Sequence, residues 1–373
     1  MTATRAPSGG APPVRARLVY THYPHMGAHA GMRQLARALD PAAVAVRSRR
    51  VQDGDDDFPL RHPAVRARLG RLVRRGGMAW YKLSDLAAEL RELPTCLAGA
   101  VDVVHFLDGE HGAQFLPAAL RLARRAPVGR LRRARTVATF HQPPELLDDL
   151  LDRAVVARLD AVTVVAPTQA AWFRALLPAD RVEVLLHGVD DAFFRPAARR
   201  DGDDDGRPLR CITVGHWLRD WSAVRRVAER LPDVAFDVVT GRPTGLEALG
   251  NVTHHHGVTD ERLRELYQRA DVLFLPLTAS TANNTLLEGM ACGLPVVSTD
   301  LDAVRAYVGD GAGVLVRDND ADALAGALVV RHDDPARRLT EGRRARARAE
   351  ALSWRASAPA YARLYRRILA AAP

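Results

Sequence analysis

Short apolar runs alternate with longer helix-like stretches along the whole chain, and this alternation constrains the fold more than any other feature. It is typical of parallel sheets covered by helices, because the crossover between parallel strands needs room for a helix. In the first half, strands are expected at residues 17–20, 101–107, 136–140, 161–166 and 182–186. In the second half they are expected at residues 209–214, 234–239, 252–256, 271–275, 295–298 and 313–316. The pattern predicts an α/β protein with two sheets of one type.

A polar, glycine-containing segment at residues 196–208 divides the two halves and has the composition of a linker. The 373 residues exceed what one hydrophobic core normally supports, which favours two domains of similar size. We expect an N-terminal domain over residues 1–195, disordered at 1–14, and a C-terminal domain over 209–352. Residues 353–373 are expected to form an amphipathic helix that packs back on the N-terminal domain. Its apolar face would consist of Tyr361, Leu364, Tyr365 and Ile368.

The formal net charge of +9 first suggests a nucleic-acid partner. Lys82 is the only lysine, and the arginines are spread along the chain, so we expect no nucleic-acid binding. The basic stretch at residues 66–75 has helical spacing of Leu69, Leu72 and Val73. It could contact an anionic membrane surface, but a solvated helix face is the favoured interpretation.

No apolar run approaches the ~18 residues that a membrane-spanning helix needs, and residues 1–13 lack the apolar centre of a secretory signal. We therefore expect a cytoplasmic protein. The three cysteines Cys96, Cys211 and Cys292 are odd in number and widely spaced, and they lie among apolar residues. This pattern predicts reduced, buried thiols.

Three segments could suggest a metal, and we expect none of them to bind one. His22, His25 and His29 lack an accompanying carboxylate or thiol. Residues 254–256 are three histidines in an expected strand, where adjacent side chains point to opposite faces. Residues 203–205 are three aspartates inside the expected linker, where a solvated charge run is the better interpretation.

Residues 283–297, NNTLLEGMACGLPVV, carry the strongest signal, because they predict a loop, a helix, a turn and a strand. A helix that begins after a strand presents free N–H groups and the positive end of its dipole, which suits phosphate. Asn283, Asn284 and Thr285 lie at that position. Glu288, one turn later, could hold the vicinal hydroxyls of a ribose, although a helix-surface glutamate is the plainer alternative.

Residues 270–276, ADVLFLP, followed by 287–297, LEGMACGLPVV, resemble the donor-site signature of glycosyltransferase family 4, a large family of retaining GT-B enzymes. Residues 159–167, 187–196 and 257–267 are also similar to that family, in the expected order. The resemblance is weakest between residues 40 and 100. It implies two Rossmann-like, doubly wound parallel-sheet domains with the active site in the interdomain cleft.

The resemblance also implies where a nucleotide diphosphate sugar would bind. The ribose would lie on Glu288 and the diphosphate on the loop from Asn283 to Thr285. The family's motifs further assign the donor site three residues: Gly215, Gly257 and Val258.

The chain departs from the family's pattern at three positions. The glutamate usually found eight residues before Glu288 is Ser280, and the usual arginine and lysine are His216 and Trp221. Because a leaving diphosphate needs fixed positive charge, we expect Arg219 to substitute, with His216 assisting if protonated.

In the N-terminal half, His141 follows an expected strand at the sheet edge where open parallel sheets bind ligands. It resembles the family's strand-end histidine, which contacts the donor sugar and phosphate, so we expect a catalytic role. His111 resembles the sugar-contacting histidine of glycogen-synthase-like relatives. Gly27 and Gly31 are loosely similar to the family's glycine-rich first loop and would allow close approach of acceptor or diphosphate.

We therefore expect a metal-independent, retaining hexosyltransferase that needs no cofactor, with a UDP- or GDP-linked sugar as donor substrate. The expected acceptor is a small molecule or a carrier-bound intermediate. Two alternatives stay open: a catalytically degenerate nucleotide-sugar-binding protein, and a GT-B-like sugar-nucleotide epimerase. The sequence leaves the acceptor, the sugar, the base and the oligomeric state undetermined.

Overall fold

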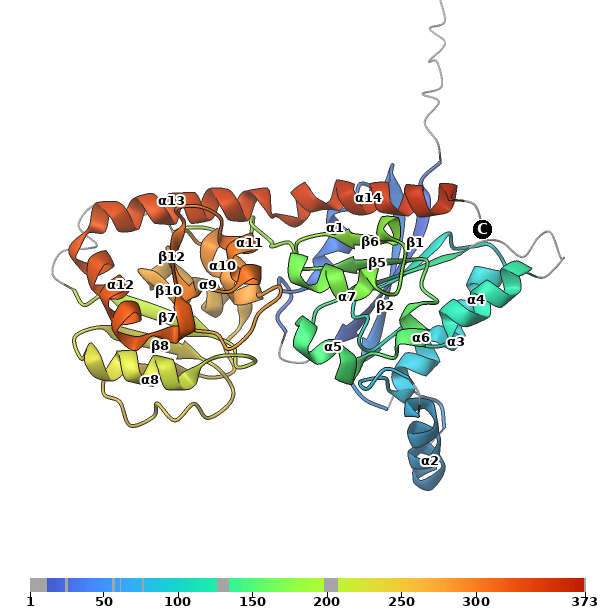
Figure 1. Cartoon of the computed structure of the whole chain (residues 1–373), viewed down its shortest axis with the longest axis horizontal. Helices are drawn as coiled ribbons and strands as arrows, with labels where there is room; N and C mark the ends of the chain where they lie inside the picture. The colour runs from blue at the N-terminus through green and yellow to red at the C-terminus, as the bar shows by residue number, and fades with distance from the viewer. Residues whose placement is uncertain are drawn as a thin grey trace, which may run out of the picture.

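The computed structural model describes residues 12–23, 26–55, 58–60, 62–75, 77–125, 134–197 and 207–371. Two α/β domains lie side by side and are spanned along one edge by two consecutive long helices (Figure 1). Of the residues 1–14 that were expected to be disordered, 1–11 lie outside the described residues, as do His25 and most of the expected linker, including residues 203–205. The expectation was wrong for Val14, which is buried and begins the first strand of the sheet.

The N-terminal domain contains a six-stranded parallel sheet in the order β2-β1-β3-β4-β5-β6. Its strands are β1 Val14–His22, β2 Val44–Gln52, β3 Val103–Phe106, β4 Arg135–Phe140, β5 Ala161–Val164 and β6 Val182–Val184. The five expected strands are all present, and the expectation missed β2. This edge strand alternates weakly and carries three arginines, so it lacks the apolar run by which the other strands were recognised.

The C-terminal domain contains a second six-stranded parallel sheet in the order β12-β11-β10-β7-β8-β9. All six expected strands form: β7 Arg210–Val214, β8 Ala235–Val239, β9 Val252–His255, β10 Val272–Leu275, β11 Val296–Thr299 and β12 Gly313–Val316. The predicted pair of Rossmann-like sheets is therefore confirmed.

Helices cover both sheets. In the N-terminal domain they are α1 Leu35–Ala38, α2 Pro63–Arg74, α3 Leu83–Leu97, α4 Leu116–Arg125, α5 Pro144–Leu150, α6 Arg153–Val156 and α7 Ala170–Arg174. In the C-terminal half they are α8 Trp221–Arg230, α9 Asp260–Arg269, α10 Asn284–Ala291, α11 Asp302–Val308, α12 Ala321–Asp333, α13 Pro335–Ala351 and α14 Trp354–Ala370. Short 3₁₀ turns lie at Met32–Gln34, Pro167–Gln169, Ala179–Arg181 and Arg317–Asn319.

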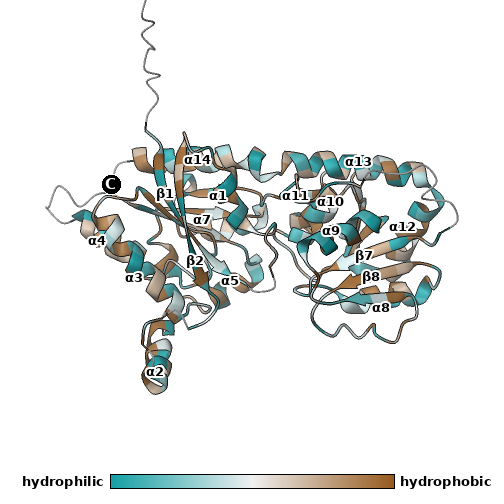
Figure 2. Ribbon diagram, turned by 180° about the vertical axis from the view of Figure 1, so that it is seen from behind, coloured by the Kyte–Doolittle hydropathy of each residue, from teal (hydrophilic) through white to brown (hydrophobic). Residues whose placement is uncertain are grey.

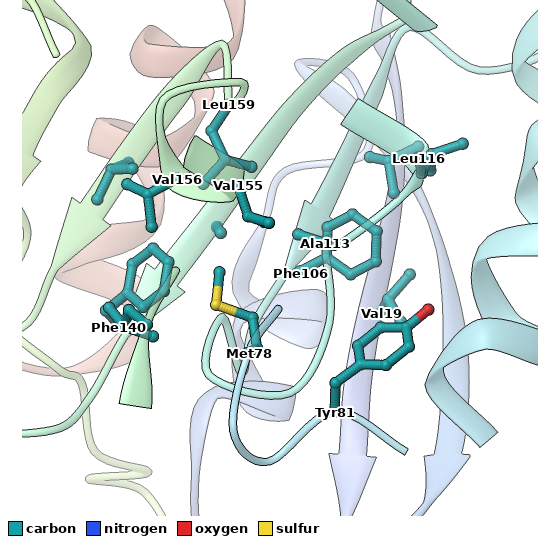
Figure 3. Packing of buried hydrophobic residues seen from close by; sticks show 14 of the residues in the cluster. Val19, Met78, Tyr81, Phe106, Ala113, Leu116, Phe140, Val155, Val156 and Leu159 are labelled. Atoms are coloured by element: carbon teal, nitrogen blue, oxygen red, sulfur yellow. The ribbon is translucent and has the colours of Figure 1, made fainter. Parts of the chain in front are cut away.

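The N-terminal sheet buries one face under α3 to α7 and the other under α1 and α14. Along β3, Val103 and Val104 point to opposite faces and join different core clusters. Figure 3 shows Met78 and Tyr81 packed on the first face beside Phe106. Cys96 is buried in this core, and Cys211 and Cys292 are also buried free thiols, as expected.

The last two helices bridge the domains. Helix α13 packs on the C-terminal domain through Ala345 and Ala349, whereas α14 packs on the N-terminal sheet through the four apolar residues that the sequence placed on one face. Between them, Trp354 lies against Gly188 and donates its backbone N–H to the Val189 carbonyl, while the Val189 N–H donates to the Leu352 carbonyl. The outward faces of both helices are mostly hydrophilic (Figure 2).

Helix α2 projects from the N-terminal domain (Figure 1). Leu72 is 64% exposed, whereas Gly70 and Val73 are buried. Nowhere in the described ranges is a helix both long and apolar enough to span a bilayer.

Candidate functional site

A cavity of 1250 Å³ lies between the domains, at the carboxyl ends of both sheets. Loops after β1 and β4 line it from one side, and loops after β7, β8, β9 and β10 line it from the other. Most of the residues expected from the sequence meet here: Gly27, His141, Gly215, His216, Arg219, Gly257, Val258, Ser280, Asn283, Asn284, Thr285 and Glu288. The remaining two, Gly31 and His111, line an adjoining cavity of 570 Å³, which is lined mostly by the N-terminal domain and also by Trp217, Ala282 and Asn284.

Helix α10 begins at the cavity. Asn283 is its N-cap, with the side-chain oxygen accepting the N–H of Leu286 at 3.4 Å, and Asn284 is the first helical residue. Thr285 is buried and donates its hydroxyl to the Val214 carbonyl. The free N–H groups and positive dipole end of α10 therefore face the cavity, an arrangement that can bind phosphate.

The guanidinium of Arg219 lies beside this helix start. It donates to the carbonyls of Val214 and Trp217 and to the hydroxyl of Thr285 at 3.1 Å. None of the described carboxylates forms an ion pair with it. Desolvation lowers the pKa of Arg219 to about 10, so it stays cationic at neutral pH. A fixed positive charge is thus present where the family's usual arginine and lysine are missing.

Two of the departures from the family pattern also line this cavity. The Nδ1 of His216 is buried without a hydrogen-bond partner among the described residues. Ser280 donates to the Thr281 carbonyl at 3.2 Å. The third departure, Trp221, begins α8 and does not line the cavity.

Glu288 is 5% exposed and accepts a hydrogen bond on Oε2 from the Tyr267 hydroxyl at 3.0 Å. Burial raises the pKa of Glu288 to about 7, and nearby Asp260 adds to this increase, whereas Tyr267 and Arg219 oppose it. Tyr267 thus binds one carboxylate oxygen of Glu288, and Glu288 itself lines the cavity. The plainer alternative of a surface glutamate is excluded by this burial.

His141 follows β4 and lines both cavities. Its Nε2 donates to the Leu107 carbonyl at 2.7 Å, which leaves Nδ1 as the free ring nitrogen. A buried carboxylate, Glu110, accepts the backbone N–H groups of His141 and Gln142. The position of the histidine is therefore fixed from two sides.

The 570 Å³ cavity contains an aromatic wall and several charged groups. The Tyr23 hydroxyl forms a hydrogen bond with His111 Nε2 at 3.0 Å, and the ring centroids of Trp80 and His111 are 5.5 Å apart. Burial lowers the pKa of His111, so this imidazole is neutral. Lys82 forms an ion pair with Asp53 at the rim.

The two domains touch at the cleft. Asp260, in the first turn of α9, accepts the N–H of His29 at 3.0 Å and lies against Gly27, where a Cβ would overlap the Asp260 carboxylate. The His29 ring stacks on Phe193 and bonds to Asp190 at 2.7 Å. On the donor side, the Thr281 hydroxyl donates to the His141 carbonyl. The glycine of the first loop, Gly27, therefore lies close to Asp260 of the opposite domain.

The described residues contain no group of three potential metal ligands. His255 pairs with Asp237 and His256 bonds to the Thr240 carbonyl. The neighbouring histidines therefore have separate partners.

Sequence reasoning missed several residues that line or support the site: Asp53, Trp80, Lys82, Glu110, Asp260, Thr281 and Tyr267. Tyr267 and Asp260 lie in a stretch with family resemblance, at the two ends of α9, and the helical pattern could have suggested them. Trp80 and Lys82 lie in the stretch of weakest resemblance and carry no local signal.

Comparisons with known proteins agree with this geometry. A family model described as "Glycosyltransferase Family 4" matches residues 18–193, and one described as "Glycosyl transferases group 1" matches residues 216–334. The chain is 35% identical over 203 residues to a D-inositol 3-phosphate glycosyltransferase of Arthrobacter sp., covering 48% of each chain. It is 32% identical over 210 residues to a phosphatidyl-myo-inositol mannosyltransferase of Mycolicibacterium smegmatis, covering 52% of this chain and 54% of the relative.

The chain spans about half the length of these curated relatives. Among solved structures it is similar to a sucrose-phosphate synthase of Thermosynechococcus elongatus, with a TM-score of 0.69 and 20% identity. That match covers 96% of this chain and 100% of the other, and it establishes the likeness of fold.

Proposed function

The chain belongs to glycosyltransferase family 4, and from that premise we propose that it transfers a sugar from a nucleotide diphosphate sugar to an acceptor hydroxyl, with retention of anomeric configuration. One observation carries the proposal: three groups meet in a single cavity. They are the helix start of α10, the guanidinium of Arg219, which forms no ion pair with the described carboxylates, and the buried carboxylate of Glu288.

Each group has a chemical task in this reaction. The N–H groups of α10 and Arg219 bind the diphosphate and stabilise the negative charge that grows on it as the glycosidic bond breaks. Glu288 accepts hydrogen bonds from the ribose hydroxyls. The sugar extends toward Ser280 and His141, where Nδ1 can accept a hydrogen bond from a sugar hydroxyl.

The acceptor enters from the 570 Å³ cavity, which adjoins the donor cavity at His141. For retention, its hydroxyl attacks the anomeric carbon on the face from which the diphosphate leaves, and a departing phosphate oxygen takes the proton. No protein carboxylate attacks the sugar in this scheme, and holding both substrates in contact supplies much of the rate. The curated relatives are named for inositol-containing acceptors, and we propose a small or carrier-bound polyol here.

The test is calorimetric titration with UDP, GDP, ADP and TDP on the wild type, on Glu288→Ala, and on Glu229→Ala as a surface control. We expect one diphosphate to bind the wild type and the control equally, and at least about tenfold more weakly to Glu288→Ala. If no diphosphate binds, the proposed donor site is overturned, whereas binding without turnover would favour the degenerate alternative.

The reaction itself is tested by product analysis with the donor that binds. Release of the diphosphate with an α-linked product from an α-linked donor is expected. An inverted product would contradict retention, and sugar release or epimerisation without any acceptor would favour the epimerase.

A further inference from the structure

The loop after β3 uses two acidic residues to hold the strands on either side of it. Asp108 accepts the N–H of Thr21, at the end of β1, over 2.8 Å. Glu110 accepts the N–H groups of His141 and Gln142, at the end of β4. The carboxyl ends of β1 and β4 are thus positioned by one loop.

Glu110 uses only half of its bonding capacity in this task. Both of its hydrogen bonds reach the same oxygen, Oε1, and no donor among the described residues reaches Oε2. The residue is 2% exposed, and what it exposes lines the 570 Å³ cavity. A carboxylate can accept about four hydrogen bonds, so a fixed acceptor with free lone pairs borders this cavity.

A second buried glutamate in the same domain shows what a structural carboxylate looks like. Glu89, also 2% exposed, accepts the N–H groups of Phe115 and Leu116 and the hydroxyl of Tyr81 at 2.7 Å. Both of its oxygens have protein donors, and it lines neither cleft cavity. The unused oxygen of Glu110 is the difference that points to a ligand.

The surroundings of Glu110 define the kind of ligand. Trp80, half-buried, supplies a flat apolar surface, and Tyr23 and His111 stand beside it. A cyclic polyol or saccharide presents C–H groups on its faces and hydroxyls at its edge, which matches an aromatic wall combined with a hydrogen-bond acceptor.

We propose that Glu110 orients the acceptor: its Oε1 holds the His141 loop, and its Oε2 accepts a hydrogen bond from a hydroxyl of a cyclic polyol or saccharide acceptor. This inference rests on the proposed function. Because a charged acceptor makes a stronger hydrogen bond than a neutral one, the carboxylate fixes the direction of the attacking ring more firmly than an amide would. No bond to Glu110 forms or breaks.

The test separates the two oxygens. In Glu110→Gln the amide oxygen can still accept both backbone N–H groups, but an NH₂ donor replaces Oε2. Glu110→Ala removes both functions, and Glu89→Gln is the matched control, a buried glutamate facing no cavity. Donor affinity is measured by calorimetry with the diphosphate that binds, and turnover by diphosphate release from the nucleotide sugar with myo-inositol, myo-inositol 3-phosphate and glucose as acceptors.

We expect Glu110→Gln to keep donor affinity within about threefold while kcat/KM for the acceptor falls about 10- to 100-fold. Glu89→Gln should lower thermal stability without this split, and Glu110→Ala should lose donor affinity as well.

Equal acceptor kinetics in the wild type and Glu110→Gln would overturn the assignment while leaving the proposed function intact. Equal losses of donor affinity and acceptor turnover in Glu110→Gln would reduce the residue to a structural role. Turnover with none of these ring acceptors would overturn the polyol assignment. Absence of donor binding in the wild type would overturn the proposed function, and this inference with it.

Discussion

The donor side and the acceptor side of the cleft are built in different ways. On the donor side, Asn283, Thr285 and Glu288 lie within two turns of one helix, α10. On the acceptor side, Tyr23, Asp53, Trp80 and Glu110 come from separate loops of the N-terminal domain. Recognition of a diphosphate and a ribose needs only a helix start and a carboxylate one turn later, whereas recognition of a variable acceptor needs contacts between distant parts of the chain.

The largest expected effect is at Arg219 on the donor side, because this residue substitutes for the arginine and lysine that the family usually has. We expect Arg219→Ala to reduce kcat about 100- to 1000-fold, since the charge on the leaving diphosphate loses its fixed cation. Arg219→Lys keeps the charge but loses the bonds to the Val214 and Trp217 carbonyls, so its activity should be intermediate. Arg225→Ala on the exposed face of α8 is the control. Activity of Arg219→Ala within threefold of the wild type would refute the role of this residue.

The pH dependence of donor binding tests a second residue of the donor side, Glu288. Burial raises the pKa of Glu288 to about 7, and ribose hydroxyls bond best to its ionised form, so affinity should fall as the pH is lowered through 7. Between pH 8 and pH 6 the ionised fraction, and hence the affinity, should fall about tenfold. Titration with an intact nucleotide sugar avoids the terminal phosphate ionisation of a free diphosphate. The profile should be flat in Glu288→Gln, and a flat wild-type profile would contradict the prediction.

The contact between the sides can be broken at Gly27. A methyl group there would overlap the carboxylate of Asp260, so Gly27→Ala should displace that carboxylate or the first loop and break the bond from the His29 N–H. We expect activity to fall about tenfold, because small displacements of substrates are costly in rate. Asp260→Ala in the same chain should restore part of the loss. If the double variant is no better than Gly27→Ala, the overlap is not the cause.

The last prediction concerns stability in the N-terminal domain, not activity. Burial lowers the pKa of His105, which lies between Tyr365 and Thr139, to about 3. An unfolded histidine titrates near 6.5, so stability from the neutral ring is intact above that pH and is lost as the pH falls from about 6.5 toward 3. At pH 5 the loss is about 2 kcal/mol. Thermal unfolding from pH 8 to pH 5 should show a steeper loss for the wild type than for His105→Gln, and equal slopes would refute it.

The sequence predicted the fold well because the evidence for a strand is local. The buried strand β10, for example, is a continuous apolar run and is followed by a helix. Strand β2 escaped because VAVRSRRVQ lies at a sheet edge, where only a few side chains are buried. Its pairing with β1 is visible only once the chain has folded.

The candidate site followed the same division. The positions of Asn283 and Glu288 could be predicted because the helix that carries them could be predicted from the local sequence. Tyr267, by contrast, contacts Glu288 across 21 sequence positions, and Glu110 contacts His141 across 31. Such pairs depend on strand order and loop path, which no local pattern encodes.

The bridge formed by α13 and α14 has a consequence for synthesis on the ribosome. Residues of β1, β3 and β4 that α14 will cover, among them Leu18, Val103 and Val137, are translated long before Trp354–Ala370. At elongation rates of about 5 to 20 residues per second, this apolar face waits roughly 10 to 50 s for its partner helix. The nascent N-terminal domain therefore has an obligatory period in which chaperones can bind it, and its folding is completed only after translation has passed through the other domain.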